Sequence, residues 1–157
     1  MSVDPREMRD TVGLFATGVC IMTTMYEGEA IGMTANSFSS LSLDPALALW
    51  NIQNDSDCFA AFTDCQYFAI NILAADQADL SNSCAKKNQH DLSADQYSVG
   101  ANGQPVINGA LATLECSLWA RYPGGDHEII VGEISQLQRN AGEPLLFFSG
   151  GYKHIGA

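Results

Sequence analysis

Near the start of the chain, hydrophobic residues recur at the spacing of an α-helix. Four of them would share one face of that helix: Met8, Val12, Phe15 and Ala16. Asp4 is a suitable capping residue and Pro5 a suitable first helical residue, whereas Gly18 is typical of a helix end. The pattern therefore predicts one amphipathic helix between Pro5 and Thr17-Gly18.

From residue 19 onward, the hydrophobic pattern is mainly that of β-strands. Strands are predicted at residues 19–25, 30–36, 46–52, 67–73, 110–120, 124–138 and 144–152. Two hairpin turns are expected between them, at residues 26–30 and at Pro123-Gly124-Gly125. Neighbouring strands joined by such turns run antiparallel.

Two further helices interrupt the strands. A short helix is expected over residues 54–62, capped by Asp55 or Ser56, with Phe59 and Phe62 turned inward. Asp76 is expected to cap another helix that extends to residue 85. Residues 86–103 are polar and irregular, which predicts a long loop of the kind that often carries function.

Together these elements define a fold class. Hairpins dominate, and the βαβ repetition of a parallel sheet is absent. The sequence predicts a mainly β fold with inserted helices, an antiparallel barrel of six or seven strands. Its 157 residues are expected to form a single domain, residues 1–157.

Composition narrows the class of protein. The chain is 46% hydrophobic and 16% charged, as expected of a folded soluble protein. No apolar run approaches the roughly 20 residues of a membrane helix. The first ten residues, MSVDPREMRD, lack the apolar stretch of a signal peptide, so a cytoplasmic location is expected.

The charge and the cysteines exclude several kinds of site. A formal net charge of −11 leaves no basic stripe for nucleic acid. A phosphorylated ligand would depend on hydroxyls, backbone N–H groups and a lysine. The chain has five cysteines, an odd number, and no two of them are spaced as CxxC. Neither a zinc site nor a disulfide framework is therefore expected. The thiols are expected to be reduced and mostly buried.

One stretch, GMTANSFSSLSLDP at residues 32–45, suggests a ligand cradle. It contains Thr34, Asn36 and four serines, and no charge before Asp44. Small residues let the backbone approach a ligand, and hydroxyls and amides bind polar groups without charge. A serine-rich connection that caps strand ends is the alternative, and composition alone leaves both open.

Other chemical motifs are sparse. The chain has no GxGxxG, no Walker lysine motif and no GxSxG, so nucleotide binding of those types and a serine hydrolase are unsupported. His90 and His154 are isolated in the sequence. His127 follows Asp126 and a glycine-rich turn, and its residue type alone allows either a surface role or a catalytic one. Asn51 and Ser56 could add polar groups from the next strand–helix junction. The start of that helix could face an anion, although Asp55 and Asp57 oppose this by charge.

Six segments, in order, resemble one family. They are LFATGVCIMTT (14–24), GMTANSFSSLSLDP (32–45), YFAINILAADQADLS (67–81), GALATLEC (109–116), GGDHEIIVGEI (124–134) and PLLFFSGGY (144–152). They are similar to the short-chain flavin reductases of two-component monooxygenases, which have the FMN-binding split-barrel fold.

The resemblance implies an activity. It implies a homodimer that binds FMN or FAD near the subunit interface, without a metal. NADH or NADPH would bind over the flavin and transfer a hydride to it. The reduced flavin would then reach a separate oxygenase by diffusion. The protein would orient the two rings and contribute little acid–base chemistry.

The resemblance also implies site residues. It assigns Ala35, Asn36 and Ser37 to the flavin ring or ribityl chain, and Ser39, Ser40 and Leu41 to the path toward the phosphate. Asn51 and Ser56 match a second flavin-binding segment. Ala85 and Lys87 match a third, with Lys87 as the candidate for the phosphate. His127 matches the histidine beside the nicotinamide and is the candidate catalytic residue, and Tyr152 matches an aromatic near the same pocket.

Two departures from the family pattern are visible. Cys84 stands where relatives usually have Phe, which predicts a thinner wall of the flavin pocket. Ser149-Gly150-Gly151 replaces a stretch that often carries Arg, which favours NADH over NADPH. Two alternatives share the fold: a flavin carrier without reductase turnover, and a reductase of another flavin-linked substrate such as a corrinoid.

Overall fold

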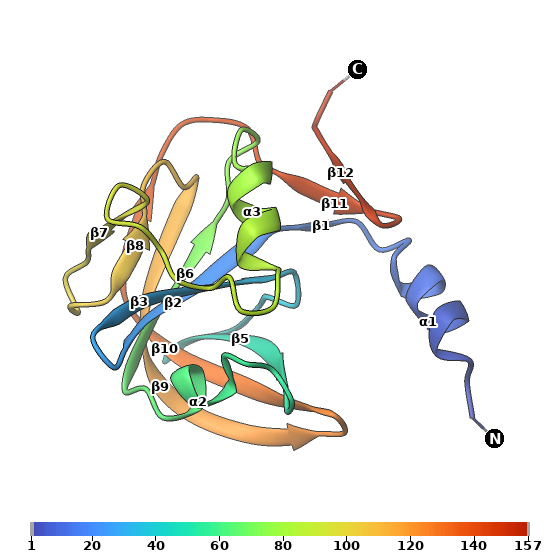
Figure 1. Cartoon of the computed structure of the whole chain (residues 1–157), viewed down its shortest axis with the longest axis horizontal. Coiled ribbons are helices and arrows are strands. Elements are labelled where there is room, and N and C mark those ends of the chain that lie inside the picture. The colour runs from blue at the N-terminus through green and yellow to red at the C-terminus, as the bar shows by residue number, and fades with distance from the viewer. Residues whose placement is uncertain (1, 157) are drawn as a thin grey trace.

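Antiparallel strands dominate the computed structural model of the protein, which describes residues 2–156 (Figure 1). The helices are α1 (Pro5–Val12), α2 (Phe59–Thr63) and α3 (Ala78–Cys84). The strands are β1 (Thr17–Gly18), β2 (Cys20–Tyr26), β3 (Glu29–Ala35), β4 (Ser39–Leu43), β5 (Ala46–Gln53), β6 (Tyr67–Ile72), β7 (Tyr97–Val99), β8 (Pro105–Ile107), β9 (Ala112–Gly124), β10 (His127–Arg139), β11 (Leu146–Phe148) and β12 (Gly151–Lys153).

Seven of these strands form one curved antiparallel sheet. Their order is β3-β2-β6-β9-β10-β5-β4, and two small sheets, β1-β11-β12 and β7-β8, are added to it. The pairing of β9 with β10 shifts register between Val131 and Gly132 and between Ile134 and Gln136. Such irregularities increase the local bend of a strand. The predicted mainly β, antiparallel barrel class is confirmed.

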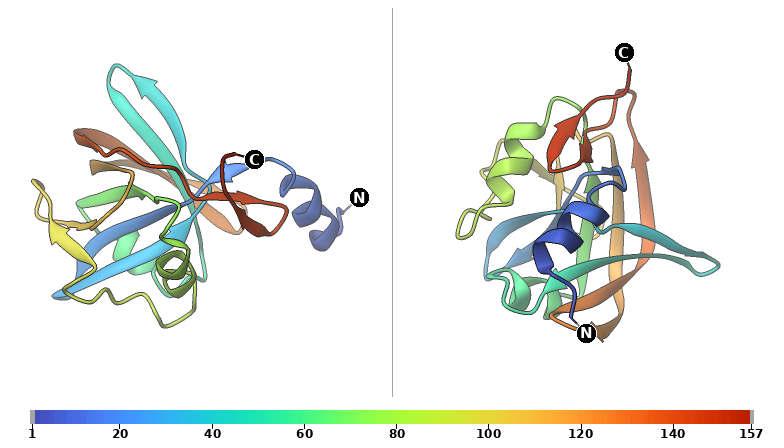
Figure 2. Two further views of the ribbon diagram at one scale, coloured as in Figure 1. Left: turned by 90° about the horizontal axis from the view of Figure 1, so that it is seen from above. Right: turned by 90° about the vertical axis from the view of Figure 1, so that its right-hand side faces the viewer.

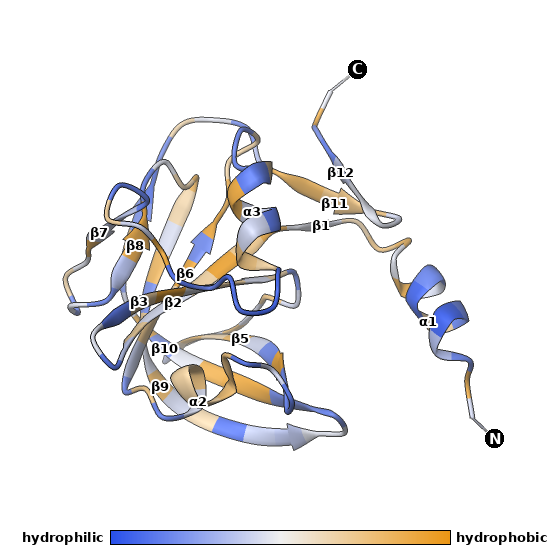
Figure 3. Ribbon diagram, in the orientation of Figure 1, coloured by the Kyte–Doolittle hydropathy of each residue, from blue (hydrophilic) through white to orange (hydrophobic). Residues whose placement is uncertain are grey.

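The core lies on the inner face of this sheet. The rings of Trp50 and Phe62 meet edge to face, with centroids 5.2 Å apart, and Phe68 lies beside them. A Cβ added at Gly132 would lie 2.6 Å from Phe68 Cζ, so the glycine makes room for that ring. A second buried cluster, which includes Ile21, packs under α3. The central strands are largely hydrophobic and α1 mostly hydrophilic in Figure 3.

Two tight turns follow the chemistry of the sequence. Glu27 and Gly28 both have positive φ, 52° and 81°, as a type I′ hairpin needs between β2 and β3. Gly125 has φ 69° and opens the two-residue loop between β9 and β10. The sequence placed that turn at Pro123-Gly124-Gly125, but Pro123 and Gly124 belong to β9. Gly125 supplies the positive φ that this loop needs, so the turn lies later than expected.

The N-terminal helix differs from its prediction. It ends at Val12, with Gly13 as its cap, and it has no buried residue. Thr17 and Gly18 instead pair with β11 as strand β1. In Figure 1, α1 projects away from the sheet beside the N-terminus. Its apolar residues Met8 and Val12 are therefore left 57% and 56% exposed.

Residues 39–43 also differ from expectation. They form β4, which pairs with β5 and projects from the sheet as a hairpin, drawn in cyan in Figure 2. Sequence analysis expected a ligand cradle or a serine-rich connection over residues 32–45, but residues 39–43 of that stretch form a paired strand. The serines of β4 therefore lie on a strand that is held by backbone hydrogen bonds to β5.

The remaining differences concern element ends. Asp76 does not cap α3, whose N-cap is Gln77 without a side-chain hydrogen bond. Helix α2 begins only at Phe59, and the hydroxyl of Ser56 accepts the Cys58 N–H in the preceding turn. The predicted loop at 86–103 contains β7, and the predicted final strand is a hairpin of β11 and β12. Within residues 2–156, no helix is long and apolar enough to cross a membrane.

Candidate functional site

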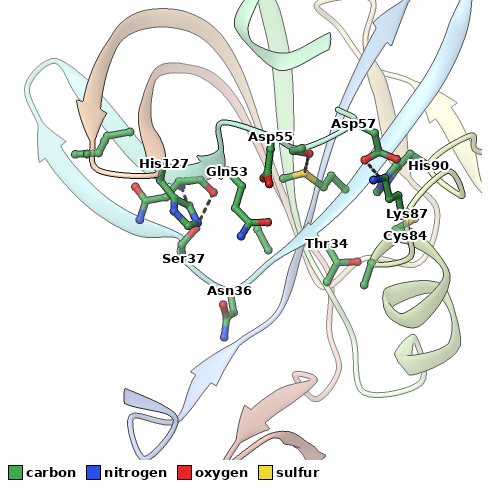
Figure 4. A pocket seen from close by; sticks show the side chains of 17 residues that line it. Thr34, Asn36, Ser37, Gln53, Asp55, Asp57, Cys84, Lys87, His90 and His127 are labelled. Atoms are coloured by element: carbon green, nitrogen blue, oxygen red, sulfur yellow. Dashed lines mark hydrogen bonds and ion pairs between the residues drawn. The ribbon is translucent and has the colours of Figure 1, made fainter. Parts of the chain in front are cut away.

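A cavity of about 790 Å³ lies where several loops and strand ends meet (Figure 4). The end of β3, the end of β5 with the loop that follows it, the end of α3 and the β9–β10 turn all contribute to its lining. Its volume is in the range of small-molecule and cofactor sites.

The structure brings most of the predicted site residues together here. Ala35, Asn36 and Ser37 line the cavity at the end of β3. Asn51 and Ser56 line it from β5 and the loop after β5. Two segments of the sequence that were assigned separately thus line the same cavity.

Three more predicted residues line the cavity from its two sides. Ala85 and Lys87 line it just after α3, and His127 lines it at the start of β10. Figure 4 shows His127 and Ser37 on one side of the cavity and Lys87 on the other. A ligand that reaches both sides would contact the β9–β10 turn at one end and a lysine at the other.

Four predicted residues do not line this cavity. Ser39, Ser40 and Leu41 lie on β4 and are exposed. Tyr152 lies on β12, where its hydroxyl is 2.6 Å from Ser81 Oγ and 3.0 Å from Asn82 Oδ1. Within one chain, Tyr152 supports α3 and does not face the cavity. The roles assigned to these four residues remain predictions.

Ser37 and Asn51 form the most informative polar contact of the site. The backbone N–H of Asn51 donates to Ser37 Oγ over 2.9 Å, so Ser37 ties the end of β3 to β5. Asn51 Oδ1 is buried and has no hydrogen-bond partner in the described part of the chain. A buried acceptor without a partner is unfavourable and is expected to meet a donor from a ligand.

His127 is held at the rim of the cavity by its neighbours. Its Nδ1 lies 2.7 Å from Asp126 Oδ1, and its side chain is 38% exposed. The Asn54 N–H donates to the Asp126 carbonyl over 2.9 Å, which fixes the β9–β10 turn to the loop after β5. The hydrogen bond from His127 and its charge lower the pKa of Asp126 below its usual value. This arrangement leaves Nε2 of His127 available to a ligand.

Sequence analysis missed a pair on the opposite wall. His90, which is isolated in the sequence, places Nε2 2.9 Å from Asp57 Oδ1, and both residues line the cavity. Burial alone would raise the pKa of Asp57, but the Asn88 N–H and His90 outweigh it and lower the pKa below its usual value. The two residues lie in separate loops, so no local spacing in the sequence could have revealed the pair.

Both acidic and basic side chains line the cavity. Asp55 and Asp57 line it together with Lys87 and His90. Among residues 2–156, Lys87 forms no salt bridge, so its ammonium group is available to a ligand. Hydroxyl and amide groups, rather than a cluster of bases, provide most of the remaining polar lining.

Cys84 forms part of the wall next to Ala85. Burial raises the pKa of its thiol to about 11, so the thiol is neutral near pH 7. All five cysteines are free. The cavity wall beside α3 is therefore small and uncharged at this position.

The fold and the cavity define a small antiparallel β-barrel protein with a polar ligand site beside its main sheet. Residues 12–156 match the sequence model of the family described as "Flavin reductase like domain". Because the match covers nearly the whole chain, the protein belongs to the flavin reductase-like family.

Curated relatives support this assignment. "FMN reductase (NADH) SmoA" of Agrobacterium fabrum is 40% identical over 94% of this chain and 84% of its own. "Flavin-dependent monooxygenase, reductase subunit HsaB" of Rhodococcus jostii is 35% identical over 98% of this chain and 80% of its own. Two other relatives are about twice as long, since the match covers 48% of each.

A solved structure agrees in fold. The structure titled "Flavin reductase PheA2 in native state" has a TM-score of 0.91 and 36% sequence identity. The match covers 99% of this chain and 100% of that one. The seven-stranded sheet described above is therefore the fold of a flavin reductase.

Proposed function

We propose that the protein is an NADH:flavin oxidoreductase that supplies reduced flavin to a separate oxygenase. The observation that carries this proposal is the cavity itself. It combines small residues, an unpaired buried acceptor on Asn51 and a histidine at the rim in one site. The NADH-dependent reductase named among the relatives supports the same activity.

The lining fits a flavin. Ala35 and Ala85 leave room for a flat ring, and Asn51 Oδ1 can accept a hydrogen bond from a ring N–H. Lys87 can neutralise one phosphate charge at the other side of the cavity. When bound, the flavin accepts a hydride from the nicotinamide and so supplies the redox chemistry. Both FMN and FAD remain candidates, because the described residues contain no feature that selects one of them.

His127 is proposed to position the nicotinamide. Asp126 holds its Nδ1, and Nε2 is left to bind the carboxamide or to contact the ring. Ser149-Gly150-Gly151 offers no base for a 2′-phosphate, which favours NADH over NADPH. His127 would thus act by orientation, and proton transfer is not required of it.

A second chain is proposed to complete the assembly. Phe15 is 79% exposed and Leu43 97%, and α1, an eight-residue helix, has no buried residue. A helix that short is marginal in water without packing. Contact with a second copy of the chain would bury these apolar side chains. It would also allow Ser39, Ser40, Leu41 and Tyr152 to approach a flavin held between subunits.

An oxygenase partner follows from the proposed activity. The chain would deliver reduced flavin to that component by release and diffusion. One relative is named as the reductase subunit of a flavin-dependent monooxygenase, which supports this role.

The test is NADH oxidation in air with purified protein. We expect the loss of NADH absorbance to depend on both protein and added flavin, with NADPH giving a slower rate. Reactions that lack protein or flavin serve as controls. If the protein binds flavin but NADH is not consumed, the alternative of a flavin carrier replaces this proposal. Faster turnover with a corrinoid than with any free flavin would instead favour the other reductase class.

A further inference from the structure

Three potential metal ligands lie close together beside the cavity, two of them in its lining and one buried behind it, and the flavin chemistry proposed above assigns no role to them. They are the Asp57 carboxylate, the Cys58 thiol and His90 Nε2. All three ligand atoms lie within 4.8 Å of one another. The Asp57 and His90 side chains are 25% and 10% exposed, and Cys58 is buried.

The backbone orients these side chains toward each other. His90 Nδ1 lies 3.1 Å from the Gly32 carbonyl oxygen, which can only accept, so Nδ1 donates and Nε2 is turned to Asp57. Asp57 Oδ2 accepts the Asn88 N–H over 2.6 Å, which leaves Oδ1 for Nε2. Metal-binding histidines in proteins commonly donate their second ring nitrogen to a carbonyl or carboxylate in this manner.

The local backbone also fixes the sequence neighbours of these ligands. The Cys58 N–H donates to Ser56 Oγ over 3.1 Å, which shapes the turn that presents Asp57 and Cys58. The Gly32 N–H donates to the His90 carbonyl over 2.8 Å, so His90 is tied to β3 by both backbone and side chain. The cluster is thus assembled before any ligand binds.

We propose that Asp57, Cys58 and His90 bind a divalent transition metal of the zinc class. One sulfur, one imidazole nitrogen and one carboxylate oxygen suit Zn²⁺ or Co²⁺ and not Mg²⁺ or Ca²⁺. Zinc lies about 2.0–2.3 Å from such ligands, which puts tetrahedral ligand atoms roughly 3.3–3.7 Å apart. The metal would therefore replace the proton between His90 Nε2 and Asp57 Oδ1, which are 2.9 Å apart and would separate slightly, and the Cys58 sulfur would need to shift by about 1 Å at most. Because Asp57 and His90 line the cavity, a water molecule could take the fourth position from that side. The net charge of −11 favours the approach of any cation.

This site contradicts the expectation from the cysteine pattern. A CxxC pair is the usual sequence sign of zinc, and none is present. Here one cysteine adjoins Asp57, and the histidine comes from the loop after α3. Only the pairing of that loop with β3 brings them together.

The experiment uses the full chain, without an affinity tag and without added flavin, titrated with Co²⁺. We expect one equivalent to produce a near-ultraviolet thiolate-to-cobalt charge-transfer band. Zn²⁺ is expected to abolish that band by competition, whereas excess Mg²⁺ is not. Absence of the band overturns the proposal, because Cys58 would then bind no metal.

Substitutions of the proposed ligands test whether the charge-transfer band arises from these residues. Cys58→Ser should remove it, and Cys65→Ser, the matched control at a half-buried thiol outside the cluster, should retain it. His90→Gln keeps the thiol and should weaken Co²⁺ binding by at least about tenfold. Retention of the band in Cys58→Ser, or unchanged affinity in His90→Gln, would overturn the site. If Cys58→Ser does not fold, His90→Gln alone decides.

Discussion

Asn51 presents a polar group that the chain itself does not satisfy. Its Oδ1 is buried without a partner within residues 2–156, while its backbone N–H is bound by Ser37. The unpaired oxygen is therefore unfavourable in the ligand-free protein, but it can accept a hydrogen bond from a ligand that carries a donor. Ser37 differs, because its hydroxyl already serves the fold.

Replacement of Asn51 separates stability from binding. In Asn51→Ala we expect flavin binding to weaken by about 1–3 kcal/mol, because one buried hydrogen bond is lost. The free energy of unfolding of the flavin-free protein should not fall, since an unpaired buried oxygen is removed. Flavin fluorescence titration and urea unfolding measure the two quantities.

Ser37→Ala is the matched control. It removes the acceptor of the Asn51 N–H, so the free energy of unfolding should fall by about 1 kcal/mol. Unchanged flavin affinity in Asn51→Ala would remove that side chain from the site.

His127 tests the nicotinamide side of the cavity. In His127→Ala we expect kcat/KM for NADH to fall about five- to tenfold, the equivalent of roughly 1–1.5 kcal/mol for one hydrogen bond. Flavin affinity should remain nearly unchanged. Steady-state kinetics at saturating flavin provide the measurement, with the exposed residue changed in His154→Ala as control. NADH kinetics equal to those of the wild type would show that the role assigned to His127 is wrong.

At the scale of the elements, the sheet depends on close packing between Gly132 of β10 and the ring of Phe68, which reaches across β9 from β6. Gly132 lies at a register shift of β10, directly against Phe68. No other residue type leaves room for the ring there. The register shift of β10 and the contact with Phe68 therefore occur at the same glycine.

Gly132→Ala measures this dependence. Its Cβ would meet Phe68 Cζ at 2.6 Å and Cys116 Cβ at 2.9 Å. We expect a loss of about 1–3 kcal/mol of unfolding free energy, as for other overpacked cores. Gly18→Ala is the control, because a Cβ at Gly18 meets nothing within 4 Å. Equal urea midpoints for the two variants would contradict the packing described here.

The sequence predicted the buried strands better than the edges and ends. Strands such as β2, β5 and β6 carry dense apolar runs, and burial enforces that pattern. Strand β4 was missed because serines at an exposed edge resemble a loop, and only pairing with β5 defines it. The turn at Gly125 was misplaced because three neighbouring residues, Pro123, Gly124 and Gly125, all favour turns.

The candidate site was predictable only in part. Asn51, Ser56 and Lys87 were assigned through family resemblance, and the structure places them around one cavity. Asp57 and His90 could not be paired in advance, because their contact depends on a loop that folds back along β3. The helical spacing of Met8 and Val12 was detected, but Phe15, which was expected on the same face, lies beyond the end of α1 at Val12. Spacing alone also does not say what covers that face.

At the scale of the whole molecule, the exposed apolar residues beside α1 form the surface through which the proposed dimer would assemble. We expect the wild-type protein to have twice the 16.8 kDa mass of one chain by light scattering. Phe15→Asp should shift it toward the monomer, since a charge would be buried in the interface. Val99→Asp, at a 71% exposed position on β7, is the control. A monomeric wild type at micromolar concentration would contradict the proposed dimer.

The central claim is that this cavity holds a flavin and that NADH reduces it there. The most direct measurement is rapid mixing of the protein–flavin complex with NADH in the absence of oxygen, followed by flavin absorbance. We expect bleaching in a single phase whose rate saturates with NADH and is slower in His127→Ala. Bleaching no faster than that of free flavin with NADH would contradict the account.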